Sequence, residues 1–190
     1  MKRAVGGTAV LAGVLAGGAV ASRRRWARRM TSTKPQGIYL DDHLAGATAG
    51  VELAEKLRSS NQGTALGTAL AGLVQDIRQD RATLEELMER LDVHKNPVKQ
   101  VVGWVSEKLT RLRLNERLTG DADLTRLLEI EALSLGIEGK LALWRALKAV
   151  AELDARLAGT DLDGLIDRAR RQRETLEPYR LEAAAKAFSP

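Results

Sequence analysis

Residues 124–150 read LTRLLEIEALSLGIEGKLALWRALKAV, and this stretch decides the fold. Wound as an α-helix, it presents apolar side chains around most of its circumference. The polar strip that remains is narrow and runs through Thr125, Glu129, Gly136 and Lys140. A helix that is apolar on most sides is normally buried among other helices, so we expect the rest of the chain to pack around residues 124–150.

The chain from residue 38 onward repeats the 3.6-residue spacing of apolar residues and shows no sustained strand-like alternation. Besides the central stretch, this spacing predicts helices at about residues 38–58, 64–91, 97–114 and 162–187. The connections are short, which predicts an all-α fold, an up-and-down bundle of four or five helices over residues 38–190. Gly46 and Gly50 flank the apolar face of the first helix, where we expect small residues to let a neighbouring helix approach closely.

The net charge of +5 combines two unequal parts of the chain. Residues 1–34 hold eight basic and no acidic side chains, whereas the remainder holds 22 basic and 25 acidic ones. Because the body is close to neutral, we do not expect it to bind nucleic acid. The chain has no cysteine, which excludes a disulfide framework, a thiolate nucleophile and a cysteine-based zinc site.

Residues 1–30 form a leader that contains an uncharged run at residues 4–21. This run is 18 residues long, which is close to the minimum length of a membrane-spanning helix. The run is followed by a basic cluster with one tryptophan: Arg23, Arg24, Arg25, Trp26, Arg28 and Arg29. The positive-inside rule keeps these arginines in the cytoplasm, where they also attract anionic lipid. We therefore predict a short N-terminal hydrophobic helix as membrane anchor, a linker at residues 31–37 and a cytoplasmic body. The alternative is a signal peptide cleaved near Ala21, which would export the body.

Charged residues fall within the apolar faces of three predicted helices. They are Asp80, Glu131, Glu138, Arg145, Arg173 and Arg180. Desolvation costs several kcal/mol per ion, so each of these groups needs a partner if it is buried. Equal numbers of carboxylates and guanidiniums predict a neutral, buried ion-pair network with a structural role. A site for a small ligand or an anion, and a metal site with altered ligands, are the alternatives.

Long helices with inward-facing acids make residues 38–187 resemble the ferritin-like superfamily of helical bundles. That resemblance implies a di-metal site built from a Glu on each of two helices and Glu-x-x-His on each of two others. Here Glu131 is followed three residues later by Ser134, and the two histidines, His43 and His94, do not stand three residues after a carboxylate on a helix seam. The resemblance therefore extends to topology, and we predict no metal and no cofactor.

The sequence contains no phosphate-binding loop, dinucleotide-binding glycine pattern, zinc-protease motif or nucleophile elbow. We therefore lean towards a non-enzymatic role, as a membrane-anchored interaction or scaffolding module at the cytoplasmic face with an unidentified protein partner. Gly13 and Gly17 in the hydrophobic run would suit self-association into a homo-oligomer. Two alternatives stay open: a ferritin-like metalloprotein with non-standard carboxylate ligands, and a protein that binds anionic surfaces through its arginines.

Overall fold

The computed structural model describes residues 33–93 and 122–189, and this part of the chain is helical throughout, without a strand. Its elements are α2 (Thr33–Ser60), α3 (Ala65–Arg90), α5 (Ala122–Val150), the short 3-10 helix η1 (Ala155–Leu157) and α6 (Leu162–Ala187). The prediction of an all-α fold is confirmed. The predicted hydrophobic helix in the leader and the predicted helix at 97–114 lie outside the described residues.

The chain divides into two compact units, Met1–Gln36 and Gly37–Pro190. Helix α2 begins at Thr33, so the end of the predicted linker 31–37 is helical. Pro35 is compatible with this because it lies in the first turn, where its missing N–H would have no intrahelical acceptor. The description below concerns the unit Gly37–Pro190.

A tight turn joins α2 to α3 and fixes these two helices as a hairpin. Thr64 caps α3, since its hydroxyl oxygen accepts a hydrogen bond of 3.1 Å from the backbone N–H of Gly67. Gly67 has no room for a side chain, because a Cβ there would lie 2.0 Å from the backbone oxygen of Asn61. Gly63 has φ +77°, a backbone conformation that glycine adopts without strain. The turn is therefore specified by its own residues.

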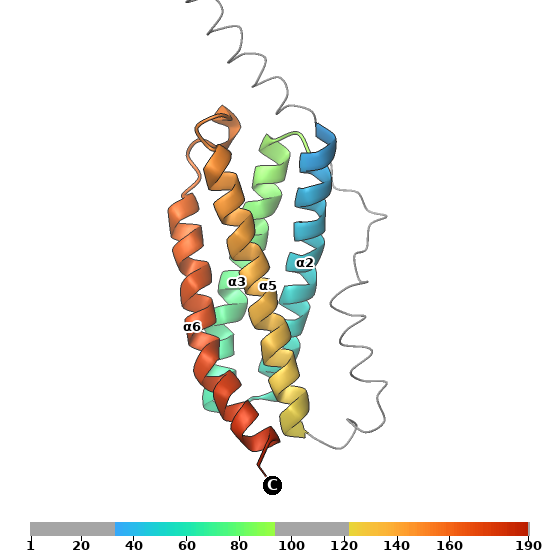
Figure 1. The fold of residues 1–190 in the computed structure, drawn as a ribbon, viewed down its shortest axis with the longest axis vertical. Helices are drawn as coiled ribbons and strands as arrows, with labels where there is room; N and C mark the ends of the chain where they lie inside the picture. Colours follow the sequence, from blue (N-terminus) through green and yellow to red (C-terminus); the bar gives the residue numbers. More distant parts are fainter. Residues whose placement is uncertain (1–32, 94–121, 190) are drawn as a thin grey trace, which may run out of the picture. The chain divides into compact units, whose positions relative to one another are not determined.

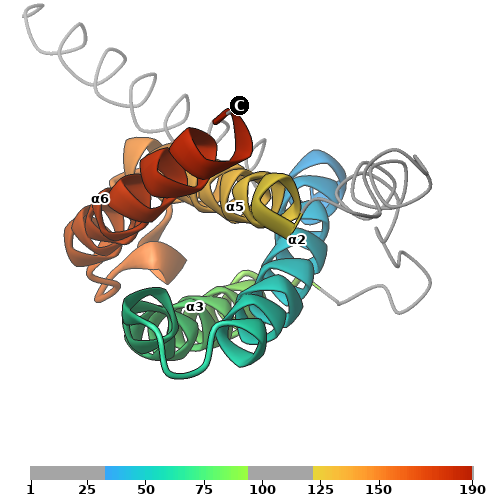
Figure 2. The same cartoon turned by 90° about the horizontal axis from the view of Figure 1, so that it is seen from below.

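Helices α2 and α6 run in one direction along the bundle, and α3 and α5 run in the other (Figure 1). Viewed along its length, the bundle is a ring in which α5 lies between α2 and α6 and faces α3 (Figure 2). Consecutive helices are antiparallel within the α2–α3 and α5–α6 pairs, and α3 is parallel to α5. Up-and-down order between the two pairs depends on residues 94–121, which lie outside the described residues. The connection from α3 to α5, residues 94–121, includes the predicted helix 97–114 and is not described.

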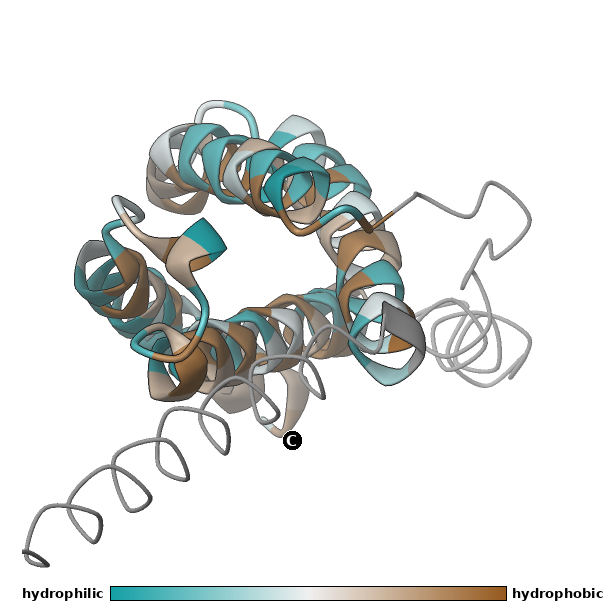
Figure 3. Cartoon of the chain, turned by 90° about the horizontal axis from the view of Figure 1, so that it is seen from above, coloured by the Kyte–Doolittle hydropathy of each residue, from teal (hydrophilic) through white to brown (hydrophobic). Residues whose placement is uncertain are grey.

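Apolar residues gather on the sides of the helices that face one another (Figure 3). The predicted seam of α3 is confirmed, since its members are all buried: Leu66, Leu70, Leu73, Ile77, Leu84, Leu87 and Leu91. Helix α5 is not surrounded on all sides, because each helix of a ring keeps an outer side in contact with solvent. Leu135 of α5, for example, is 65% exposed. Within the two described stretches, no helix is both long and apolar enough to cross a membrane.

Candidate functional site

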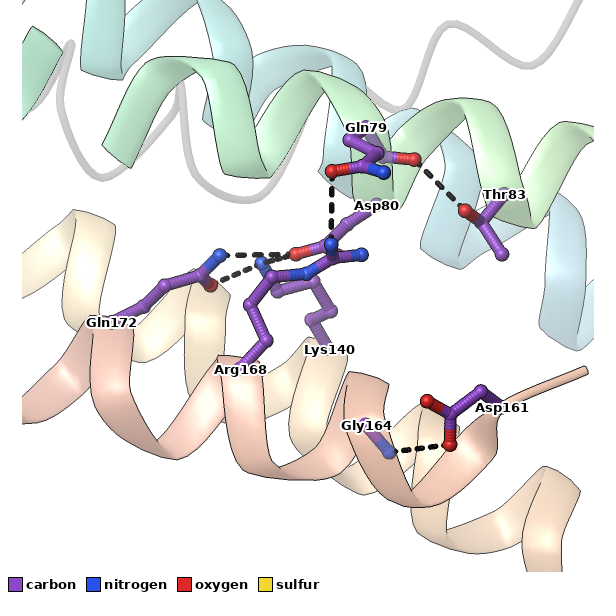
Figure 4. Close-up of polar contacts among 8 residues, drawn as sticks. All are labelled: Gln79, Asp80, Thr83, Lys140, Asp161, Gly164, Arg168 and Gln172. Atoms are coloured by element: carbon purple, nitrogen blue, oxygen red, sulfur yellow. Dashed lines mark hydrogen bonds and ion pairs between the residues drawn. The ribbon is translucent and has the colours of Figure 1, made fainter. Parts of the chain in front are cut away.

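A buried ion cluster centred on Asp80 joins α3, α5 and α6 (Figure 4). The side chain of Asp80 is 1% exposed. Its Oδ2 accepts hydrogen bonds from Lys140 Nζ at 2.5 Å and Gln172 Nε2 at 3.1 Å, and its Oδ1 lies 2.5 Å from Arg168 Nη2. Lys140 also donates to Gln172 Oε1, and Arg168 donates to Gln79 Oε1 at 2.9 Å. Three helices are thus held together by one carboxylate.

Burial lowers the pKa of Lys140 below its ordinary value. The negative charge and hydrogen bond of Asp80 oppose this effect, and the positive charge of Arg168 adds to it. Removing water from an ammonium group in this position outweighs the attraction of a single carboxylate. The opposite charges of the cluster are paired, although Asp80 Oδ1 and Arg168 Nε have no hydrogen-bond partner among the described residues. This pairing suits a structural role that sets the register of the three helices.

Asp80 is buried as predicted, but the other five residues of the predicted network are not gathered around it. Glu138 pairs with Arg173, and Glu131 pairs with Arg180 at 3.3 Å, both at the surface. The side chains in the first pair are 44% and 47% exposed, so the predicted burial of these residues was wrong. Arg145 is exposed. The error arose because α5 is apolar on several sides, and its buried side depends on where its neighbours lie.

The sequence prediction missed three members of the real cluster. Lys140 was assigned to the polar strip of residues 124–150, and Arg168 and Gln172 were not considered. One signal was present: Gln172 interrupts the α6 seam between Ala169 and Leu176, just as Asp80 interrupts the α3 seam. Each of these polar residues replaces an apolar residue on the buried face of its helix, where water is excluded. Two such residues on different helices of one bundle are therefore candidates for a hydrogen bond with each other.

The described residues offer no group of three or more His, Asp and Glu side chains that could hold a metal ion. His43 lies on α2, and His94 lies outside the described stretches. Asp80 is surrounded by Lys140 and Arg168, which compete with a cation for its oxygens.

A cavity of about 480 Å³ lies between α2, α3 and α5. Its lining is largely apolar and includes Leu53, Ile77, Leu84, Leu143 and Trp144. Small-molecule sites in proteins typically occupy 300–1,000 Å³ and combine such a lining with a few polar groups. The size and lining of this cavity therefore suit a ligand.

Four glycines on the two helices that flank the cavity keep it open. Gly46 and Gly50 on α2, and Gly136 and Gly139 on α5, all line the cavity. A Cβ added at any of them would meet no atom of the described stretches within 4 Å. Among the described residues no helix packs closely beside Gly46 and Gly50, so the predicted close approach is not seen in this part of the chain. None of the four has a positive φ, so backbone conformation does not require glycine there either.

At another position, Gly164, neighbouring atoms do require glycine. A Cβ at Gly164 would lie 2.2 Å from Oδ2 of Asp161, the residue that caps α6 by accepting the Gly164 N–H at 2.9 Å. Gly72 on α3 is exposed, has open space around it and does not line the cavity. It supplies a matched control for the four cavity glycines.

The lining carries polar groups on all three helices: Asp42, His43, Asp80, Arg81, Glu131, Lys140 and the indole of Trp144. Helix α2 begins and α5 ends at the same end of the bundle (Figure 1), and the lining residues Asp42, His43 and Trp144 belong to these parts of the two helices. Burial lowers the pKa of His43, an effect that Asp42 partly offsets, and the imidazole makes an edge contact with the ring of Tyr39 at 4.5 Å. Trp144 is 1% exposed, and its indole N–H has no hydrogen-bond partner among the described residues.

Comparison of the chain with protein-family models, with curated proteins and with solved structures gave no match.

Proposed function

We propose that this chain is a membrane-tethered, non-enzymatic binding protein whose helical unit holds an apolar ligand in the cavity between α2, α3 and α5. The observation that carries the proposal is the set of four glycines around the cavity. Within a helix, each glycine costs up to about 1 kcal/mol relative to alanine. Neither the backbone conformation nor any atom of residues 33–93 and 122–189 requires glycine at these positions. An open cavity is what they preserve.

The tether is supported by the sequence of the leader. The uncharged run at residues 4–21 is followed by five arginines, which oppose translocation and favour a cytoplasmic location for the body. Helix α2, which contributes Gly46 and Gly50, follows the leader directly in sequence. An apolar ligand has low solubility in water, so a protein that binds one benefits from attachment to the membrane, where such molecules are concentrated.

Photolabelling of the full-length chain tests the binding site. The chain, held in a lipid-free amphipol, is irradiated with the small apolar carbene precursor 3-(trifluoromethyl)-3-phenyldiazirine, and adducts are located by peptide mass spectrometry. We expect adducts on Leu53 and Leu143, and at least a tenfold loss of them in the double variant Gly50→Leu/Gly139→Leu, which fills the cavity. The control Gly72→Leu should label like the wild type.

Equal labelling of all three proteins, or no labelling of the cavity in the wild type, would refute the proposal. One further outcome would refute ligand binding and would instead show that another part of the chain fills the cavity. If the cavity becomes labelled only after Val102→Asp, an apolar position of the predicted helix 97–114, the chain's own segment fills the space. Protease access to a C-terminal tag on intact cells tests the tether separately, and an exported, soluble product beginning near Ser22 would contradict it.

A further inference from the structure

The dimensions of the cavity restrict the shape of its occupant. On α5 the lining runs from Leu128 to Trp144, and on α2 from Asp42 to Leu53. At 1.5 Å per residue these stretches span about 24 Å and about 16 Å. A volume of about 480 Å³ spread over such a length leaves a narrow cross-section. The cavity is therefore long and thin, and it suits a single flexible chain better than a fused ring system.

The two ends of the cavity differ in polarity. Exposed Asp42 and part-buried His43 lie at one end with Trp144, whose buried N–H lacks an acceptor among the described residues. The buried Nε–H of Arg81, which also lines the cavity, lacks an acceptor there too. Buried N–H groups without a partner are rare, and an oxygen carried by an occupant at this end would supply one. At the other end the lining includes Leu53 and Leu128, and the carboxylate of Glu131 is already paired with Arg180. An occupant with one polar end would thus lie in a defined direction.

We infer that the natural ligand is a single-chain amphiphile of the membrane, a monoacyl lipid whose chain lies along the cavity and whose oxygen-bearing head lies at the Asp42–His43 end. This inference rests on the proposed binding function. It fits the position of Asp42 and His43, which follow closely in sequence on the predicted membrane anchor. Exposed Leu135 and Gly136, which line the cavity, leave it open at the bundle surface and give a chain a lateral path of entry.

The test is competition for diazirine labelling by lysophosphatidylcholines of 8 to 20 carbons, each below its micelle concentration, on the full-length chain in amphipol. Burial of one methylene contributes about 0.8 kcal/mol, so each added carbon should lower the half-maximal concentration about fourfold. A water-sized group takes up about 30 Å³, so the cavity holds about 16 such groups, and the gain should stop at roughly 12–16 carbons. Cholesterol, which is rigid and wide, should compete at least tenfold less well than the best lysolipid.

Two variants sharpen the result. Gly136→Leu obstructs the cavity part-way along, so the gain should stop at a shorter chain, whereas Gly72→Leu should leave the chain-length profile unchanged. Trp144→Phe removes the N–H and keeps an aromatic ring, so we expect roughly a threefold to tenfold weaker competition by lysolipid, a loss typical of one neutral hydrogen bond. Competition by tetradecane, which has no oxygen, should be unaffected.

The outcomes separate this inference from the function on which it rests. Absence of labelling in the cavity refutes the binding function itself. Labelling that cholesterol, tetradecane and all lysolipids suppress equally well refutes the single-chain ligand and leaves the apolar site in place. A chain-length profile that Gly136→Leu does not alter also refutes it, because the chain would then lie elsewhere.

Discussion

Replacing the cavity glycines by alanine should stabilise the protein. At Gly46, Gly50, Gly136 and Gly139 the new methyl group meets no atom of the described part of the chain within 4 Å, so no steric penalty from these residues opposes the gain in helix propensity. That gain is about 0.5–1 kcal/mol per position, partly because alanine reduces the conformational freedom of the unfolded chain. The quadruple variant should therefore gain roughly 2–4 kcal/mol if the positions act independently.

Urea and thermal unfolding of the full-length chain, followed by far-ultraviolet circular dichroism, would measure this gain. A stabilisation of 1 kcal/mol raises the melting temperature of a domain of this size by about 2–4 °C, so each single variant is measurable. Gly67→Ala is the opposite control and should destabilise, because its Cβ would lie 2.0 Å from the Asn61 oxygen. If Gly50→Ala or Gly139→Ala destabilises the protein as well, another part of the chain occupies the space, and the reasoning fails.

Three further predictions concern charged groups. Asp80→Asn should destabilise the unit by about 3–5 kcal/mol, because it leaves Lys140 and Arg168 without their carboxylate partner. Glu138→Gln, at an exposed ion pair, should change stability by less than about 1 kcal/mol. Equal effects of the two substitutions in urea unfolding would contradict this prediction. Because the pKa of Lys140 is lowered from 10.5 in the folded state, the unfolded chain binds more protons just below that pH, and the unfolding free energy should rise with pH there. Lys140→Met should remove this rise, which can be measured as the wild-type minus variant difference between pH 9 and 10.5. The pKa of His43 is lowered from 6.5, so stability should fall as the pH drops below about 6.5, and His43→Gln should flatten that slope.

Local patterns in the sequence were sufficient to predict the four long helices of the described residues and the buried seam of α3. The spacing of Leu70, Leu73, Ile77 and Leu84 depends on one helix alone, and the interruption at Asp80 marked a buried charge correctly. The orientation of α5 depends instead on which of its apolar sides the other helices cover. Lys140 was therefore placed on the solvent side, although its ammonium group reaches Asp80 inside the bundle.

The cavity was not predictable for a related reason. A pair such as Gly46 and Gly50 has the same sequence pattern whether the neighbouring helix approaches closely or stays apart. Helices α2 and α5 are also joined by an ion pair between Lys56 and Glu129, which the glycine pattern does not reveal. Only the arrangement in space shows that the glycines of both helices face a common empty volume.

The central claim is that the cavity holds an apolar molecule, and native mass spectrometry of the full-length chain purified from its own membranes tests it most directly. We predict one bound species of lipid mass in the wild type and in Gly72→Leu, released on denaturation and lost in Gly50→Leu/Gly139→Leu. A wild-type protein without a bound species, or one whose bound species persists when the cavity is filled, would contradict the account.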